Sequence, residues 1–475
     1  MTDAAAHLID GTWEGGERTL DVHNPADGSV VGSVVWGSGA DATRAADAAA
    51  RALDGWAATP ARARADVLLA AAALVVERKE HLGRLLATEA GKRLPEAVAE
   101  VAFSAEYLRW FAEEARRPQG DVLTGEAPGR RHLTLRRPAG VVASLTPWNF
   151  PCSIQARKLA PALAAGCTVV ARVSEKAPLA VTEMLRCLTD AGLPPGVLNL
   201  VHGEPREVTG ALLAHRAVRV VTFTGSTGVG REIMRTASDS VVRPLLELGG
   251  DAAFVVFDDA DLDAAVEGAL LAKFRNTGQS CVAANRFVVQ DGVYDEFVGR
   301  LVERVDAMTV GDGLADPCPD LGPVIDDTRV RAVTGLVEQA VGAGARLLTA
   351  ERDVPRRGHY VAPALLADVP DGVGLACEEV FGPVAGVFRF RDEAEAVRRA
   401  NASDMGLAGY VWTRDAERCW RMADAMDVGI LGVNDPLPSV AFAPMGGVKQ
   451  SGLGREGSRL GLEEFTDVRY LAWRA

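Results

Sequence analysis

The sequence predicts an α/β protein with two α/β domains and a further β strand that pairs outside both. Short β-rich runs alternate with helical segments from Gly140 onward, and a second alternation begins near Phe254 and continues past Val411. Alternation of this kind is typical of βαβ units that build a parallel sheet. The tail from Leu462 to Trp473 is the candidate for the outlying strand.

Three helices are expected before the first alternation, at residues 42–57, 60–90 and 95–114. Asp41 stands where an N-cap is expected for the first helix, and Gly91 directly follows the second. A stretch punctuated by Gly and Pro, from Pro118 to Gly129, then leads to Arg131–Arg137. That last segment alternates apolar and polar residues, which predicts a strand.

The first alternation supplies most of one sheet. Its expected strands are Val141–Leu145, Thr168–Ala171, Val197–Val201 and Val218–Thr224. Its expected helices are Ile154–Ala165, Leu179–Ala191 and Val229–Ala237. A further β run, Pro244–Leu248, precedes Gly249–Gly250, where we expect the two domains to join.

Composition and charge exclude several classes of protein. The 475 residues suggest two to four structural units, and the net charge of −13 disfavours binding to nucleic acid or anionic membranes. No apolar run of about 18 residues predicts a membrane span, and the N-terminus has no signal-peptide pattern. The seven scattered cysteines form no C-x-x-C pair, which argues against disulfides and zinc. We therefore expect a cytoplasmic protein without a bound metal.

One cysteine differs from the others in its surroundings. Cys281 ends a polar, glycine-broken loop, Phe274–Ser280, that can expose a sulfur and direct backbone N–H groups toward it. A nucleophilic thiol needs a lowered pKa or a nearby base. Taken alone, a single cysteine in a loop is more often an ordinary thiol.

A carboxylate and an amide stand at the ends of two expected strands. Glu247 ends an apolar run before two glycines, which suits a general base facing a cleft, although a surface glutamate at a strand end fits the same pattern. Asn149 lies in Thr146–Pro151, where two prolines stiffen a turn. Its side-chain amide could stabilise an oxyanion, or the turn could be structural and bury Trp148.

A third motif lies between an expected strand and an expected helix. The segment Phe223–Gly230 is rich in glycine, and the N-terminus of a helix after a strand is a site for a phosphate. The spacing is not that of the usual dinucleotide fingerprint. A plain β–α turn is the alternative.

These motifs, in this order, resemble those of the aldehyde dehydrogenase superfamily, and most of all those of its succinate-semialdehyde dehydrogenase-like members. The resemblance runs from about Leu8 to Trp473. It implies two Rossmann-like α/β domains, one for NAD(P) binding at 1–118 and 139–249 and one catalytic at 250–455. It also implies a small β oligomerisation element at 119–138 and 456–475, and a homodimer or homotetramer.

The resemblance assigns roles to individual residues. Cys281 matches the nucleophile, Glu247 the general base, Asn149 the oxyanion donor and Lys158 a proton relay. The residues that match cofactor contacts are Trp148, Arg172, Ser174, Glu175, Gly225, Ser226, Gly230, Leu248, Glu379 and Phe381. Asn434 and the run Pro444–Glu456 match motifs near the active site and subunit contact. The implied reaction is oxidation of a small aldehyde to the acid through a thiohemiacetal and a thioester on Cys281.

The cofactor motif departs from the family at one position. The family has K-P-S-E where this chain has Arg172-Val173-Ser174-Glu175. Arginine is forked and could hold a 2′-phosphate, whereas Glu175 can accept a bond from a 2′-hydroxyl and would repel that phosphate. We therefore expect NAD as the preferred cofactor, with NADP still open.

Substrate choice depends on three residues that match the carboxylate-binding positions of succinate-semialdehyde dehydrogenases. They are Arg157, Arg275 and Ser439. Guanidinium groups would hold a sulfonate or phosphonate nearly as well as a carboxylate, and each arginine could instead form a structural ion pair. A short anionic aldehyde such as succinate semialdehyde is the expected substrate, and a neutral aldehyde is the alternative. A non-catalytic scaffold protein and a redox-free thioesterase or acyltransferase are the other interpretations.

Overall fold

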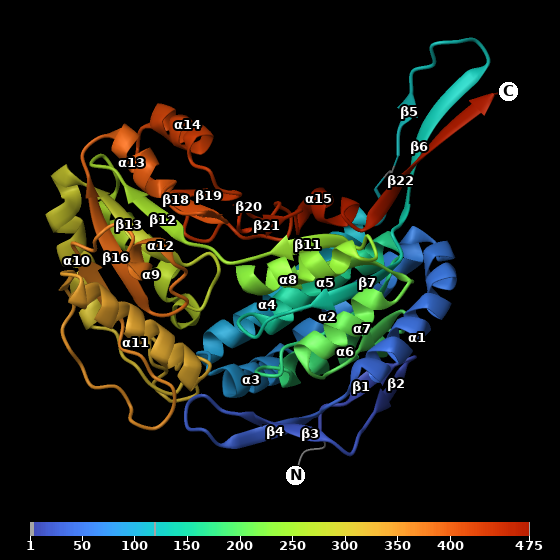
Figure 1. Cartoon of the computed structure of the whole chain (residues 1–475), viewed down its shortest axis with the longest axis horizontal. Helices are drawn as coiled ribbons and strands as arrows, with labels where there is room; N and C mark the ends of the chain where they lie inside the picture. Colours follow the sequence, from blue (N-terminus) through green and yellow to red (C-terminus); the bar gives the residue numbers. More distant parts are fainter. Residues whose placement is uncertain (1–3, 118–119, 475) are drawn as a thin grey trace.

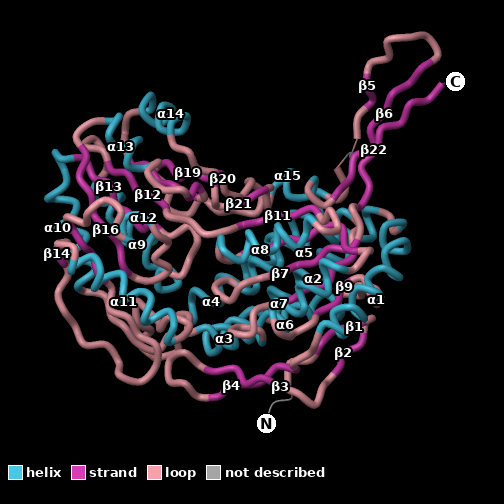
Figure 2. Tube along the Cα trace, viewed as in Figure 1, coloured by secondary structure: helices cyan, strands magenta, loops and turns pink. Residues whose placement is uncertain are grey.

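The computed structural model describes residues 4–117 and 120–474. Two large sheets lie in separate halves of the molecule, and a thin β arm projects from one half (Figure 1). Helices and loops surround both sheets (Figure 2). This arrangement confirms the predicted α/β class with two Rossmann-like units and a small separate β element.

The first sheet has the strand order β2-β1-β9-β8-β7-β10-β11-β21. The strands are β1 His7–Ile9, β2 Thr12–Glu14, β7 Val141–Leu145, β8 Thr168–Arg172, β9 Leu198–Leu200, β10 Val218–Thr224, β11 Arg243–Glu247 and β21 Gly452–Leu453. From β9 to β11 all neighbours are parallel, and the chain order reverses between β7 and β10. Ligands of open α/β sheets bind at such a reversal, outside the carboxyl ends of the strands.

Helices cover both faces of this sheet. They are α1 Gly39–Ala58, α2 Ala61–Glu77, α3 Lys79–Ala90, α4 Leu94–Glu114, α5 Pro151–Ala165, α6 Leu179–Asp190, α7 Pro205–Ala214 and α8 Thr227–Ser238. Successive strand residues point to opposite faces. Val142 and Val169 therefore lie in one apolar cluster with α4 and α5, whereas Val141 and Val170 lie in another with α1 and α7.

The second sheet has the order β14-β15-β16-β13-β12-β18-β19, parallel except for β14. The strands are β12 Ala252–Val256, β13 Ala284–Gln290, β14 Arg346–Leu347, β15 Ala364–Ala367, β16 Val384–Phe390, β18 Ala408–Trp412 and β19 Ile430–Val433. Its helices are α9 Leu262–Phe274, η1 Arg275–Gly278, η2 Asp291–Val293, α10 Tyr294–Asp306, α11 Asp327–Gly342, α12 Gly374–Cys377, α13 Glu393–Ala400 and α14 Ala416–Ala425. Phe254 and Phe287 face one apolar cluster, and Val255 and Val288 the other.

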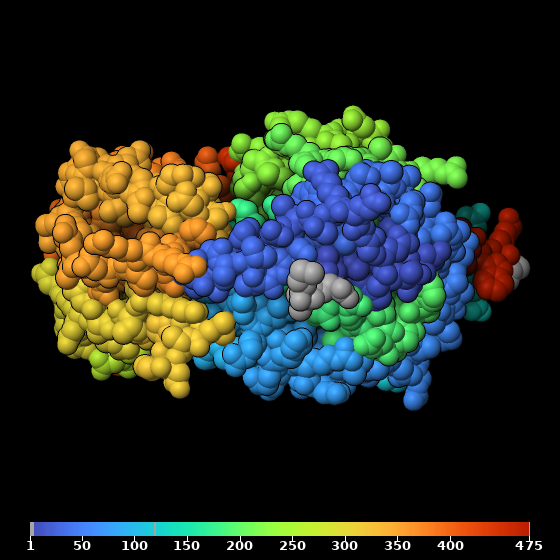
Figure 3. All heavy atoms as spheres, turned by 90° about the horizontal axis from the view of Figure 1, so that it is seen from below, coloured from blue at the N-terminus to red at the C-terminus, as the bar shows by residue number. Residues whose placement is uncertain are grey.

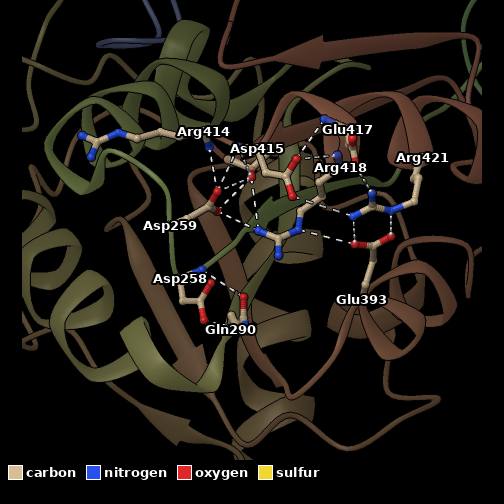
Figure 4. A network of polar contacts seen from close by, with 10 residues as sticks. Asp258, Asp259, Gln290, Glu393, Arg414, Asp415, Glu417, Arg418 and Arg421 are labelled. Carbon is tan, nitrogen blue, oxygen red and sulfur yellow. Dashed lines mark hydrogen bonds and ion pairs between the residues drawn. The ribbon is translucent and has the colours of Figure 1, made fainter.

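A polar network joins the loops at one end of this second sheet (Figure 4). Asp259, after β12, pairs with Arg418 of α14 at 2.8 Å and accepts hydrogen bonds from Thr413. Glu393 of α13 pairs with Arg418 at 3.4 Å and with Arg421 at 2.7 Å. The network therefore links α13 and α14 to the carboxyl ends of β12 and β18.

The projecting arm consists of β5 Val122–Leu123, β6 Arg130–Pro138 and β22 Thr466–Arg474. Strand β22 pairs with β6 in antiparallel register from Thr466↔Pro138 to Arg474↔Arg130. The short helix α15 Ser458–Glu463 precedes β22. The final strand thus pairs far from the second sheet, as its sequence predicted.

Two smaller ribbons complete the fold, β3 Thr19–His23 with β4 Val30–Val35 and β17 Met405–Gly406 with β20 Val448–Lys449. The N-terminal segment between β3 and β4 reaches the other half of the molecule (Figure 3). There the backbone N–H of His359 donates to Pro25 at 2.9 Å, and Arg357 donates to the carbonyl of Asp27 at 2.7 Å. The two halves are therefore held together outside their junction near Gly250.

Several predicted elements need correction. Ser38, not Asp41, is the N-cap of α1, and the Asp41 carboxylate accepts from the Ser38 backbone N–H at 2.9 Å in a capping box. The helix expected over 60–90 is two helices that break at Arg78, and α7 was not predicted. The tail is helical to Glu463 before β22 begins.

The residue boundaries of the three units stay a prediction. The expected boundary between residues 118 and 119 lies outside the described residues. Strand β21, which the prediction placed in the catalytic unit, hydrogen-bonds to β11 of the first sheet. Across the described residues, no helix combines the length and apolar character needed to cross a membrane, and no group of three or more potential ligands is arranged for a metal.

Candidate active site

Three polar side chains meet where the two sheets face each other. Asn149 follows β7, and Glu247 is the last residue of β11, so the parallel strands carry both to the same edge of the first sheet. Cys281 comes from the other half, in the loop between η1 and β13. The structure therefore brings together the three residues expected to act as nucleophile, base and oxyanion donor.

The Cys281 thiol is directed at a carboxylate. Its Sγ donates a hydrogen bond to Glu247 Oε1 at 3.0 Å. Burial raises the pKa of Cys281, and the negative charge of Glu247 raises it further. The sulfur therefore holds its proton at rest, and Glu247 is the group positioned to remove it.

The loop before Cys281 is strained and held by hydrogen bonds. Asn276 and Thr277 have φ values of 53° and 55°, in the left-handed region that non-glycine residues rarely adopt. The Asn276 amide donates to the carbonyl oxygens of Asn149 and Gln279, at 3.0 and 3.1 Å. These contacts fix the loop against the turn that carries Asn149.

Close backbone approach explains one glycine of the E-L-G-G motif. A Cβ at Gly250 would lie 2.1 Å from the carbonyl oxygen of Cys281, a distance that no side chain tolerates. The Gly250 N–H also donates to Glu379 Oε1 at 3.0 Å. The glycine therefore lets the second sheet approach the first at the site.

One part of the Asn149 side-chain amide is already hydrogen-bonded. Its Nδ2 donates to the carbonyl of Gln279 at 3.2 Å, and its Oδ1 has no hydrogen-bond partner among the described residues. A side-chain amide carries two N–H donors, so one remains for another acceptor.

Cys281 lines two separate cavities. The first, of about 280 Å³, is also lined by Phe103, Tyr107, Phe150, Arg157, Arg275 and Ser439. The second, of about 150 Å³, is lined by Trp148, Asn149, Gly225, Ser226, Leu248, Glu379 and Phe381. The first cavity is mostly apolar and holds two arginines, and it is also lined by Glu96 and Glu100, whose carboxylates pair with Arg93 and Lys92. The sulfur therefore lies on the partition between this cavity and one formed by residues expected to bind a cofactor.

The second cavity combines aromatic rings with buried polar groups. The rings of Trp148 and Phe381 meet edge to face, with centroids 5.5 Å apart. Burial raises the pKa of Glu379 to about 7. The buried Thr224 Oγ1, like Asn149 Oδ1, has no partner within the described chain. These unpaired acceptors and donors fit a polar ligand.

A third cavity, of about 500 Å³, lies on the other side of the turn from β10 to α8 and is lined by Arg172, Glu204, Arg206, Phe223, Val229 and Glu232. The N-terminus of α8, capped by Ser226, lies between the second and third cavities. Because a helix N-terminus is a site for a phosphate, the two cavities lie where the two ends of the expected dinucleotide would be held.

Three of the expected cofactor residues, Ser174, Glu175 and Gly230, line neither the second nor the third cavity. Arg172 pairs with Glu175 at 2.6 Å and donates to the Gly203 carbonyl at 3.1 Å. Ser174 is buried, and its Oγ accepts from the Lys176 backbone. Gly230 packs so closely on Leu248 that a Cβ there would lie 2.5 Å from it.

The two expected substrate arginines differ in their partners. Arg157 is 5% exposed and pairs with Glu247 at 3.2 Å and Glu456 at 2.5 Å. Although burial disfavours its charge, Glu456 and Glu247 raise the pKa of Arg157. Arg275 lies over the Phe150 ring at 5.4 Å and forms no ion pair with any residue in 4–117 or 120–474. Arg275 therefore carries the uncompensated positive charge of the first cavity.

Lys158 lies behind these groups. It is fully buried, forms an ion pair with Glu456 and donates to Thr222 Oγ1 at 3.1 Å. Burial lowers the pKa of Lys158, against the opposing effect of Glu456. The residue contacts Cys281 only through other groups.

Sequence reasoning missed several residues at the site. Glu456 was noted only as part of a motif, and Tyr107 and Phe103 were not singled out within the helix expected at 95–114. Arg329, which lies over the Phe381 ring at 5.3 Å and lines the second cavity, was also missed. No local pattern marks these residues, because their role depends on which elements pack against them.

Comparisons with known proteins point to one family. The model of the aldehyde dehydrogenase family matches residues 13–471. The chain is 44% identical over 465 residues to a glutarate-semialdehyde dehydrogenase of Pseudomonas putida, which covers 98% of this chain and 96% of the relative. It is also 44% identical over 468 residues to an NADP(+) succinate-semialdehyde dehydrogenase of Escherichia coli, with the same coverage. A crystal structure of succinate-semialdehyde dehydrogenase from Burkholderia pseudomallei has a TM-score of 0.96 at 42% identity, covering 99% of this chain and 98% of that one.

Proposed function

The chain belongs to the aldehyde dehydrogenase family of NAD(P)-dependent oxidoreductases, and on that premise we propose that it oxidises a short anionic aldehyde, such as succinate semialdehyde, to the acid. The observation that carries the proposal is the position of Cys281 on the partition between two cavities. A nucleophile placed there can contact an aldehyde on one side and a hydride acceptor on the other.

The geometry supports roles for three residues. Glu247 accepts the thiol proton across the 3.0 Å contact, and Cys281 Sγ then adds to the aldehyde carbon. The second N–H of the Asn149 amide stabilises the oxyanion, a type of contact worth about 3–4 kcal/mol. Loss of hydride leaves a thioester on the sulfur, and Glu247 activates the water that hydrolyses it.

The cofactor would be held by residues of the second and third cavities. Bound NAD(P) supplies the hydride acceptor, with Trp148, Glu379 and Phe381 around its nicotinamide end and Ser226 at the pyrophosphate. Glu247 must release the thiol proton before it can activate water, and we propose Lys158 as the relay that takes it up. Lys158 lies in the same buried cluster as Glu456 and Arg157, and the Arg157 guanidinium orients Glu247 without carrying the proton itself.

The charge of the first cavity supports an anionic substrate. Arg275 has no carboxylate partner in the described chain, so a substrate carboxylate can supply one. Arg157 shares its charge with two glutamates but keeps further N–H groups, and Ser439 adds a hydroxyl. A sulfonate or phosphonate would satisfy the same donors.

We further propose NAD as the preferred cofactor. The Glu175 carboxylate disfavours a 2′-phosphate, while its pair with Arg172 offsets part of that charge. NADP is therefore expected to be used less efficiently rather than excluded.

The test is a panel of carboxylated, sulfonated, phosphonated and neutral aldehydes, each assayed with NAD and NADP by reduced-cofactor absorbance. We expect the highest kcat/KM with a carboxylated aldehyde and NAD.

The Arg275→Met variant tests the charge of the first cavity. It should lower kcat/KM for anionic aldehydes by about tenfold or more and leave kcat/KM for neutral aldehydes unchanged, because a hydrogen-bonded charge is lost. A wild-type preference for neutral aldehydes contradicts the substrate class. Full activity in Cys281→Ala contradicts the mechanism.

A further inference from the structure

One hydroxyl in the first cavity has no hydrogen-bond acceptor among the described residues. Tyr107, on α4, is 1% exposed and lines the same cavity as Cys281. Its ring packs edge to face on Phe103, with centroids 5.1 Å apart. Its Oη forms no hydrogen bond of normal geometry with any described residue. Buried polar groups are nearly always hydrogen-bonded, so an unpaired hydroxyl facing a cavity indicates a missing acceptor.

The neighbours of Tyr107 do not supply that acceptor. Arg157 and Ser439 lie beside its hydroxyl. A guanidinium group has no acceptor atom, and the Ser439 hydroxyl donates only to the weakly accepting Met445 Sδ, at 3.5 Å. Burial raises the pKa of Tyr107, which keeps the phenol protonated and able to donate. The Tyr107 hydroxyl, and a Ser439 hydroxyl held only by a weak bond to sulfur, therefore stand together on one wall of the cavity.

We propose that Tyr107 determines substrate specificity by donating a hydrogen bond, beside Ser439, to the anionic tail of the aldehyde. The inference rests on the proposed function. The tail is then recognised by two neutral hydroxyls as well as by the charge of Arg275. A carboxylate can accept bonds from all three groups, because its two oxygens offer about four acceptor positions. A methyl group at that place would leave both hydroxyls unpaired, so the wall also selects against neutral chains.

The test compares Tyr107→Phe with wild type on two aldehydes, succinate semialdehyde and its neutral counterpart pentanal. We expect KM for succinate semialdehyde to rise about tenfold with kcat nearly unchanged, the effect of one lost hydrogen bond to a charged group. The kinetic constants for pentanal should change less than threefold. Ser439→Ala should have the same selective effect. Tyr294→Phe removes the hydroxyl of another buried tyrosine, one that lines none of the three cavities, and should change the kinetic constants for neither aldehyde.

Thermal melting separates this role from a structural one. Because no described residue accepts a hydrogen bond from Tyr107 Oη, Tyr107→Phe should melt at the same temperature as wild type or higher. Binding of succinate, the acid formed from succinate semialdehyde, to Cys281→Ala should weaken about tenfold in calorimetry when Tyr107→Phe is added. Equal losses on both aldehydes, an unchanged KM, or a lower melting temperature would overturn the role of Tyr107. If wild type itself oxidises both aldehydes equally well, the proposed substrate class fails instead.

Discussion

At the scale of single residues, the site depends on a proton shared by sulfur and carboxylate. Cys281 is half-buried beside Glu247, and both the loss of solvent around the sulfur and the charge of Glu247 favour the neutral thiol. Arg157 contacts the other carboxylate oxygen of Glu247 at 3.2 Å, which holds the side chain in place without removing its basic oxygen from the sulfur. Cys281 is therefore activated when Glu247 removes its proton, and not by a lowered pKa of the thiol itself.

The Glu247→Gln variant tests this pair. The change removes the negative charge that raises the pKa of Cys281, so the thiol should ionise at lower pH than in wild type. The pH profile of alkylation by iodoacetamide, in the free enzyme, should shift to lower pH. Aldehyde oxidation should nevertheless fall by about 10²–10⁴-fold, because the general base is lost. Glu393→Gln, at the far end of the second sheet, is the control. An alkylation profile that stays in place or moves to higher pH contradicts the interpretation.

At the scale of elements, helix α5 positions the site, and a buried ion pair positions α5. Glu100 of α4 accepts bonds from the backbone N–H groups of Cys152 and Ser153, at 3.0 and 3.3 Å, at the first turn of α5. Lys92 pairs with the other oxygen of Glu100 at 2.5 Å, and both side chains are fully buried. A carboxylate at a helix N-terminus is favourable, and here it also fixes the helix that carries Arg157 and Lys158.

Removing one partner of the Lys92–Glu100 pair should lower the free energy of unfolding. Glu100→Ala leaves Lys92 buried without its counter-ion, and loss of one partner of a buried pair typically destabilises by about 3–5 kcal/mol. Urea unfolding of the variant should show a lower midpoint. The double variant Lys92→Met with Glu100→Gln should recover part of the loss, because it leaves no charge unpaired. A double variant as unstable as Glu100→Ala would show that the ion pair is not the cause.

At the scale of the whole molecule, the β arm carries apolar side chains into solvent. Val468 and Tyr470 of β22 are 60% and 57% exposed, and Trp473 and Val122 lie on the same arm. A projecting ribbon with this many exposed apolar groups marks an interaction surface. We therefore propose that the arm pairs with a second copy of this chain, in a homodimer or homotetramer, as expected for an oligomerisation element.

Charged substitutions on the arm test the assembly. Val468→Asp combined with Tyr470→Asp should reduce the mass measured by light scattering from a multiple of the chain mass to that of one chain, since buried charges would face the partner. Val241→Asp, at an 86% exposed position outside the arm, should leave the mass unchanged. Wild-type protein that already has the mass of one chain would rule out the arm as an interface.

The sequence by itself determined the local elements and the residues that carry the chemistry. Strands such as Val141–Leu145 and Val218–Thr224 were predicted to the residue, because apolar β runs bounded by turns leave few alternatives. The break at Arg78 and helix α7 were not, because they depend on weak local preferences that packing overrides. Cys281, Glu247 and Asn149 were identified from motifs, and the structure brings them together.

Only the tertiary structure decided which charges are compensated. Arg157 and Arg275 looked equivalent in sequence, yet Arg157 meets Glu247, 90 residues away, and Lys158 beside it meets Glu456, 298 residues away. The missing acceptor of the Tyr107 hydroxyl is likewise known only from the way α4 packs against the first cavity. Local sequence sets what a side chain can donate or accept. Which partner it finds is set by the docking of distant elements, so the free donors that select a substrate appear only in the folded chain.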